Sequence, residues 1–124
     1  MFPRPLKRGD TLGVVAPAGP SEAAALEAGL AFLRELGDFH FTWAANLGEQ
    51  WGYLAGEDHA RAAGLMEMFS RPDVAGILCA RGGYGSARLL PYLDFDLIRS
   101  HPKLFLGSSD VTLLTLALRK HAGL

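Results

Sequence analysis

The residues whose side chains are most suited to catalysis form the turn Gly107-Ser108-Ser109-Asp110, between a short apolar run and a helix-like apolar pattern. This turn carries two hydroxyls and a carboxylate. In a parallel α/β sheet, such a strand-to-helix turn lies at the carboxyl end of a strand, where ligands bind and the first N–H groups of the helix are available. A serine there would meet a ready-made anion site, so Ser109 is a candidate nucleophile.

Two interpretations of this turn stay open. As a nucleophile elbow, it would use Gly107 for tight packing, Ser109 at the apex and Asp110 to complement the helix dipole. The G-x-S-x-G elbow of α/β-hydrolases requires glycine at position 111, where this chain has Val111, so the elbow would be of another kind. In the alternative, Ser108 or Ser109 is only the N-cap of the last helix.

A second turn that could take part in binding or catalysis is the glycine-rich segment Arg81-Gly82-Gly83-Tyr84-Gly85, which follows the clearest apolar run of the chain. Its glycines would let a backbone N–H approach a ligand closely. Together with the N–H of Asp110, such a donor could form an oxyanion hole, where losing one donor typically costs about 3 to 4 kcal/mol of barrier. A plain tight turn is the alternative. We expect this segment, the turn at Ser109 and residues 16–20 to gather at one edge of the sheet.

A nucleophilic serine also needs a base that a third group orients. The chain has four histidines. His101 precedes the strand that leads to Ser109 and belongs at the opposite edge, His40 lies within a strand, and His121 ends the last helix. His59 is the one imidazole that could approach Ser109. We therefore expect the general base to be missing from this chain.

Composition narrows the classes of protein. With 124 residues, of which 49% are hydrophobic and 20% charged, the chain is typical of one soluble globular domain. A net charge of −1 offers no basic patch for nucleic acid or a membrane surface and favours a small neutral or zwitterionic ligand. No apolar run approaches the roughly 20 residues of a membrane span. The single cysteine excludes a disulfide framework and favours a reducing, cytoplasmic location.

Other kinds of site are not indicated. The segment Gly83-x-Gly85-x-x-Arg88 lacks the third glycine of a dinucleotide fingerprint, and no G-K-[ST] phosphate loop occurs. The histidines and Cys79 lack metal-ligand spacing. Cys79 stands between apolar neighbours, which favours a buried core thiol over a nucleophile. The sequence thus predicts neither a metal nor a cofactor.

The elements that must position these turns follow from the apolar pattern. Short apolar runs predict strands, and longer segments with helical spacing predict helices. The predicted strands are residues 11–16, 39–43, 74–80 and 103–106; the predicted helices are 21–37 (with Ser21 as N-cap), 57–71, a short stretch through Leu89 and Leu90, 94–100 and 111–121. This alternation, with crossovers long enough for parallel pairing, predicts an α/β domain with an open doubly wound sheet. The last helix is apolar on several faces and needs more cover than so small a sheet supplies.

With these motifs in place, the chain resembles the serine LD-carboxypeptidase family, that is, the muramoyl-tetrapeptide carboxypeptidases and their microcin-immunity relatives. The similarity extends over nearly the whole chain and rests on four ordered segments. They are residues 12–19 (LGVVAPAG), 53–58 (YLAGED) with Arg61 and Ala62, 79–85 (CARGGYG) with Leu89-Leu90-Pro91, and 107–112 (GSSDVT).

The resemblance implies specific roles. Ser109 would be the nucleophile, and the backbone amides of Asp110 and Gly83 would form the oxyanion hole. The fold would be a three-layer domain of the flavodoxin-like or class I glutamine-amidotransferase-like type. We also expect Arg81, Tyr84 and Ser108 to contact the substrate, although the family usually has an aromatic residue at the position of Ser108.

The resemblance further implies that residues 1–124 are the N-terminal, nucleophile-bearing domain of a two-domain enzyme. The second domain, absent from this chain, would supply a glutamate and a histidine to complete the triad. The substrate would be a murein tetrapeptide that loses its terminal D-alanine, without a cofactor, and the full-length protein would be a homodimer. Two alternatives stay open: an immunity-type peptidase acting on a peptidyl-nucleotide antibiotic, and a non-catalytic flavodoxin-like module that binds a phosphate-bearing ligand.

Overall fold

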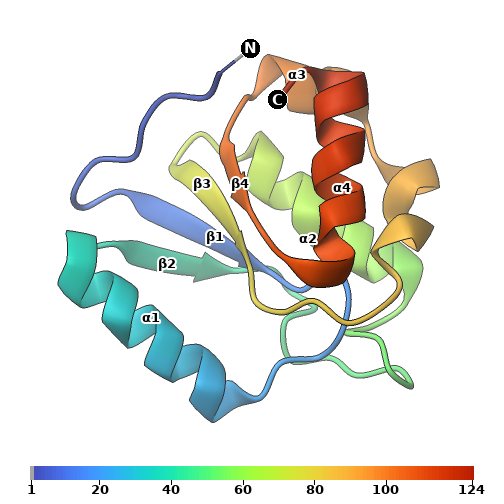
Figure 1. The fold of residues 1–124 in the computed structure, drawn as a ribbon, viewed down its shortest axis with the longest axis horizontal. Helices are drawn as coiled ribbons and strands as arrows, with labels where there is room; N and C mark the ends of the chain where they lie inside the picture. Colours follow the sequence, from blue (N-terminus) through green and yellow to red (C-terminus); the bar gives the residue numbers. More distant parts are fainter. Residues whose placement is uncertain (1) are drawn as a thin grey trace.

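The centre of the protein is a four-stranded sheet, seen in a computed structural model that describes residues 2–124 (Figure 1). The strands are β1 (Thr11–Val15), β2 (His40–Trp43), β3 (Val74–Cys79) and β4 (Leu104–Leu106), in the spatial order β2-β1-β3-β4. Every neighbouring pair is parallel. Each predicted strand is confirmed to within one residue at its ends, and parallel pairing is confirmed.

Helices cover both faces of the sheet, so the domain has three layers (Figure 1). Helix α1 (Ala23–Gly37) lies on one face, and α2 (Asp58–Ser70), α3 (Phe95–Ser100) and α4 (Thr112–Ala117) lie on the other. A 3₁₀ segment, η1 (Ser86–Tyr92), connects β3 to α3. The predicted α/β doubly wound architecture is therefore confirmed.

The main core fills the space between the sheet and helices α2, α3 and α4. Its members are apolar side chains at helical or strand spacing, which is why the sequence pattern located these elements. They include Val15, Leu65, Phe69, Ile77, Ile98 and Leu114, each at most 2% exposed. On the face of the sheet that α1 covers, apolar side chains are buried less completely, since Phe32 and Leu36 of α1 and Leu106 of β4 are all more than half exposed.

The start of α1 differs from the prediction that Ser21 caps it. The helix begins at Ala23, Glu22 occupies the N-cap position, and no side chain caps it. The hydroxyl of Ser21 is buried and has no hydrogen-bond partner within residues 2–124. Because Arg81 donates a hydrogen bond to the carbonyl of Pro20 (2.9 Å), the chain before Ser21 is tied to the glycine-rich segment rather than to the helix.

The predicted last helix, residues 111–121, is not one regular helix. It consists of a 3₁₀ turn η2 (Ser109–Val111), α4, and a π-helical turn η3 (Leu118–Ala122) that ends at Gly123 with φ +77°. Contacts from α3 hold this last turn, because Arg99 donates to the carbonyl of His121. None of the helices within residues 2–124 has the length and apolarity that crossing a bilayer demands.

Candidate active site

The turn after β4 places Ser109 in an unusual backbone conformation. Its φ is +58°, a left-handed value that a residue other than glycine adopts at a cost of about 1 to 3 kcal/mol, and such strain clusters at functional sites. Ser108 occupies the N-cap position of η2, yet neither serine makes a capping hydrogen bond within the described chain. Both residues are exposed. The positive φ of Ser109 is compatible with an elbow. Ser108 stands at the N-cap position, as the alternative interpretation predicted, but its side chain does not make the hydrogen bond of a cap within residues 2–124.

Gly107 allows this elbow to form, as the sequence predicted. A Cβ atom at position 107 would lie 2.4 Å from Cγ1 of Val111 and 3.2 Å from Sγ of Cys79. Both neighbours belong to the packed interior below the turn, and Val111 is fully buried. A side chain at position 107 would therefore push the elbow away from the sheet.

The glycine-rich segment lies directly against the elbow. A Cβ atom on Gly82 would be 2.8 Å from Cβ of Ser109 and 3.2 Å from the carbonyl oxygen of Ser108. The two turns enclose an open hollow of about 590 Å³. Its lining residues are Arg81, Gly82, Gly83, Tyr84, Ser109 and Asp110. The predicted site residues thus come together, except that Ser108 does not line this hollow.

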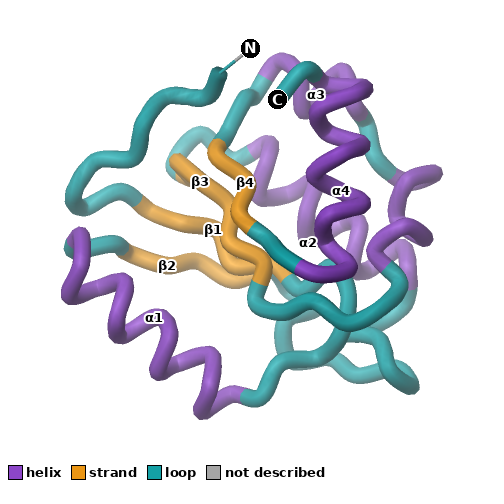
Figure 2. The backbone as a smooth tube through the Cα atoms, viewed as in Figure 1, coloured by secondary structure: helices purple, strands orange, loops and turns teal. Residues whose placement is uncertain are grey.

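The third turn expected at this edge, residues 16–20, is also present. The N–H of Gly19 donates to the carbonyl of Gly82 (3.0 Å). Gly83 has φ +122°, a conformation that glycine adopts readily, and a Cβ there would lie 3.2 Å from the backbone nitrogen of Gly19. Figure 2 shows these loops gathered at the carboxyl ends of the strands. The predicted convergence of three turns is confirmed.

Asp110 connects the elbow to the glycine-rich segment through Ser86, a residue that the sequence did not single out. The N–H of Ser86 donates to the Asp110 carboxylate (2.9 Å), and the Ser86 hydroxyl donates to the Asp110 carbonyl (2.8 Å). Ser86 is completely buried. The carboxylate of Asp110 is therefore engaged in holding the two turns together.

No histidine lines the hollow at Ser109. The side chain of His59 is 70% exposed and lies near Glu57, with 3.4 Å between Nδ1 and Oε2. The ring of His121 packs against Phe95, with 4.9 Å between the ring centroids. Within the described chain, the hydroxyl of Ser109 thus has no imidazole beside it in the hollow. The residues there can supply a nucleophile and N–H donors.

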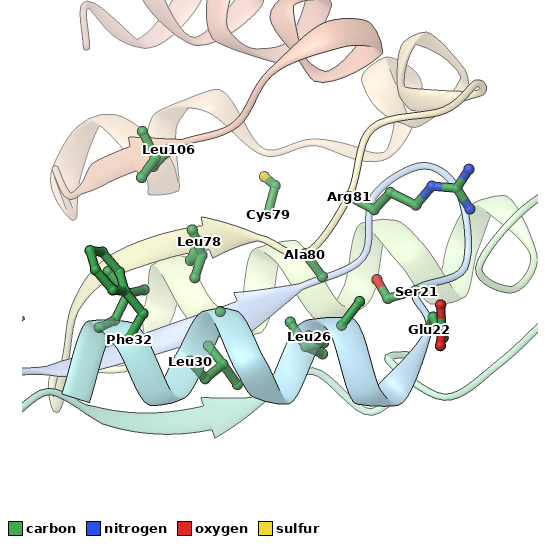
Figure 3. A pocket seen from close by; sticks show the side chains of 13 residues that line it. Ser21, Glu22, Leu26, Leu30, Phe32, Leu78, Cys79, Ala80, Arg81 and Leu106 are labelled. Carbon is green, nitrogen blue, oxygen red and sulfur yellow. The ribbon is translucent and has the colours of Figure 1, made fainter. Parts of the chain in front are cut away.

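A larger hollow of about 700 Å³ lies elsewhere, between α1 and the edge formed by β3 and β4 (Figure 3). Leu26, Leu30 and Phe32 line it from α1, and Cys79 and Leu106 line it from the sheet. Burial raises the pKa of the Cys79 thiol to about 12. The thiol therefore stays protonated near neutral pH. Cys79 was predicted to be a buried core residue; it is partly buried and packs against the core. Among residues 2–124, no group of three His, Cys, Asp or Glu side chains is placed to hold a metal ion.

The protein is an all-parallel, three-layer α/β domain in which a serine with positive φ lies against a glycine-rich segment, and the sequence identifies the family of this domain. Residues 12–124 match the LD-carboxypeptidase N-terminal domain of the S66 peptidases, and the chain belongs to this family. It is 47% identical to a probable murein peptide carboxypeptidase of Bacillus subtilis, over 98% of this chain and 38% of that protein. It is 33% identical to the microcin C7 self-immunity protein MccF of Escherichia coli, over 97% of this chain and 36% of that protein.

The fold agrees with this assignment. The structure of an MccF-like protein from Bacillus anthracis superimposes with a TM-score of 0.94 at 38% identity, covering 100% of this chain and 38% of that one. The chain thus spans less than two fifths of the length of these relatives. The resemblance drawn from the four sequence segments is confirmed at the level of family and fold.

Proposed function

We propose that the full-length protein carrying this domain is a serine carboxypeptidase that removes the terminal D-alanine from murein tetrapeptides, with Ser109 as its nucleophile. The observation that carries the proposal is the elbow itself. Ser109 stands exposed at φ +58°, against the glycine-rich segment and within a hollow that can admit a peptide end. The murein peptide carboxypeptidase among the relatives supports the choice of substrate.

In the proposed mechanism, the hydroxyl oxygen of Ser109 attacks the carbonyl carbon of the bond to D-alanine while its proton passes to a general base. The N–H groups of Asp110 and Gly83 would hold the negative oxygen of the tetrahedral intermediate, each contributing about 3 to 4 kcal/mol. The base then returns the proton to the nitrogen of the scissile bond, so that collapse of the intermediate breaks the C–N bond, releases D-alanine and leaves an acyl ester on Ser109. Water then hydrolyses the ester.

The base belongs to the proposal as well. Since no histidine lines the hollow, a glutamate and a histidine from a second domain would complete the triad, as the family resemblance implies. Arg81 supports the choice of a peptide with a free carboxyl end, because it is a cationic side chain lining the hollow. Tyr84, which also lines it, would contact the peptide, and Ser108 would do so from the rim.

Mutation of the two neighbouring serines tests the nucleophile. Ser109→Ala in the full-length protein should abolish D-alanine release from an LD-tetrapeptide, because no other hydroxyl stands at the apex of the elbow. Ser108→Ala should retain turnover, with any change confined to KM. Release of D-alanine by Ser109→Ala at the wild-type rate would refute the assignment. The isolated 124-residue chain should be inactive, and a comparable rate from it would contradict the need for a second domain.

A second candidate function is cleavage of a peptidyl-nucleotide antibiotic. The similarity to the self-immunity protein MccF favours it, and the elbow alone does not separate the two substrates. Assaying the full-length protein on both substrates decides between them. A non-catalytic module that binds a phosphate-bearing ligand predicts instead that Ser109→Ala leaves the function of the protein unchanged.

We also propose that the full-length protein is a cytoplasmic homodimer. The single cysteine supports the location, since exported proteins of this size often carry disulfides. Cell fractionation tests the location, and light scattering of the purified full-length protein tests the dimer.

A further inference from the structure

Arg61, on α2, is a buried cation that the mechanism above does not use. Its side chain is 0% exposed. Nε donates to the carbonyl of Gly56 (3.0 Å), and Nη1 donates to the carbonyls of Pro17 (2.7 Å) and Gly85 (2.9 Å). Nη2 pairs with the carboxylate of Asp58. Four of the five N–H donors of the guanidinium are thus engaged.

Burying this guanidinium is costly, because a cation loses its hydration in the interior. That burial lowers the pKa of Arg61, while the charge of Asp58 acts in the opposite direction. An apolar side chain of similar volume would avoid the cost but leave the buried carbonyls of Gly56 and Pro17 without these donors, at about 1 to 3 kcal/mol each. The carbonyl of Gly85 would lose the donor from Arg61 and keep only the N–H of Arg88 (3.2 Å). The arrangement therefore favours a role for the fork of donors beyond filling space.

The three carbonyls belong to three different segments at the carboxyl edge of the sheet. Pro17 lies in the loop after β1, Gly56 precedes α2, and Gly85 closes the glycine-rich segment. At its other end this segment is held by the hydrogen bond from Gly19 to Gly82. Gly83 lies between the two attachments, so the direction of its N–H depends on both.

We propose that Arg61 is a positioning residue that orients the glycine-rich segment toward Ser109, so that the N–H of Gly83 faces the developing oxyanion. This inference rests on the proposed function of Ser109 and extends it to a residue that lines no part of the hollow. Arg61 acts through the carbonyl of Gly85 and does not touch the substrate.

The proposal requires the geometry of the guanidinium as well as its charge. A lysine keeps the charge and can pair with Asp58, but its ammonium is a compact group at the end of a flexible chain and does not present a planar fork. It cannot reach the carbonyls of Gly56, Pro17 and Gly85 with the same directions. Arg61→Lys therefore separates orientation of the loop from simple compensation of charge.

The test is to compare Arg61→Lys with Arg71→Lys in the full-length protein. Arg71 terminates the same helix at its other end, where it pairs with Asp73 and Thr42, so the second variant makes the same chemical change away from the site. Arg61→Lys should lower kcat for D-alanine release by about 100-fold, as expected for loss of orientation at one donor. Its KM should change less than about threefold, and Arg71→Lys should leave both constants unchanged.

A peptide boronic acid, in which boron replaces the scissile carbonyl carbon, gives a second measurement. The Ser109 oxygen bonds to boron, its proton passes to the base, and one boron-bound oxygen occupies the oxyanion position. Arg61→Lys should weaken this inhibitor by about the same factor as it lowers kcat/KM. Neither KM nor an inhibition constant depends on the concentration of folded enzyme. Both constants can therefore be measured even if part of the Arg61→Lys protein is unfolded.

Wild-type kcat and wild-type boronate affinity in Arg61→Lys would overturn the positioning role. So would an equal loss of activity in Arg71→Lys. Failure of the proposed function looks different, because Ser109→Ala would then retain activity. If Ser109→Ala is inactive and Arg61→Lys is unimpaired, the nucleophile stands and only the role of Arg61 is refuted.

Discussion

Adding one methyl group to the glycine-rich segment is the sharpest perturbation of the site that the structure offers. In Gly82→Ala, the new Cβ would lie 2.8 Å from Cβ of Ser109 and 3.3 Å from its hydroxyl oxygen. The backbone of Gly82 is outside the left-handed region, so alanine is tolerated by the local conformation. The substitution therefore acts through contact with Ser109.

The magnitude follows from the distances. Ordinary Cβ contacts begin at 3.4 Å, so Ser109 or the segment must move by about 0.6 Å to accept the methyl group. A displacement approaching 1 Å at a reacting group can cost about 100-fold in rate, equivalent to about 2.7 kcal/mol of barrier. We expect Gly82→Ala to lower kcat/KM for D-alanine release by roughly this factor.

The assay is steady-state hydrolysis of an LD-tetrapeptide by the full-length protein, with thermal unfolding measured in parallel. Gly29→Ala is the matched control, because a Cβ on Gly29 in α1 would meet nothing within 4 Å. Gly29→Ala should keep wild-type kcat/KM and stabilise the helix by about 0.5 to 1 kcal/mol. A folded Gly82→Ala protein with wild-type kcat/KM would refute the reasoning, since the segment and Ser109 could not then be in contact.

Two further predictions concern stability and reactivity. Because burial raises the pKa of Cys79 to about 12, a thiol reagent at pH 8 should label the native protein far more slowly than the denatured protein, and equal rates would contradict the placement of Cys79. Hydrogen bonds from Arg88 lower the pKa of Asp58, so its carboxylate stabilises the fold above the ordinary pKa of about 3.9 and loses this effect in more acidic solution. Asp58→Asn should accordingly lower the Tm at neutral pH, and the difference from wild type should shrink as the pH falls below about 4.

The predictable part of the site comes from topology. Once the apolar runs are assigned to parallel strands, the turns after β1, β3 and β4 must share one edge of the sheet, because every crossover returns the chain to the same starting edge. The contacts of Gly82 with Ser109 and of Gly19 with Gly82 confirm this expectation. The roles of individual residues in catalysis stay predictions.

The residues that sequence reasoning missed or misplaced are polar groups whose partners lie far along the chain. Ser86 gave no signal except its place after the last glycine of the segment, yet it bonds Asp110, 24 residues away. The sequence singled out Arg61 only as part of the segments that carry the family resemblance, and its hydrogen-bond partner Pro17 is 44 residues away. Ser21 has the residue type of a cap, but its hydroxyl is buried instead.

The sequence by itself determined the strands, most helix positions and the three turns, because periodic apolar residues and glycine act over a few neighbouring positions. Only the tertiary structure decided that Ser109 adopts φ +58° and that the guanidinium of Arg61 is buried among three loops. The physical reason is that a strained backbone and a dehydrated cation are unfavourable locally. They persist only where packing and hydrogen bonds from distant segments offset their cost.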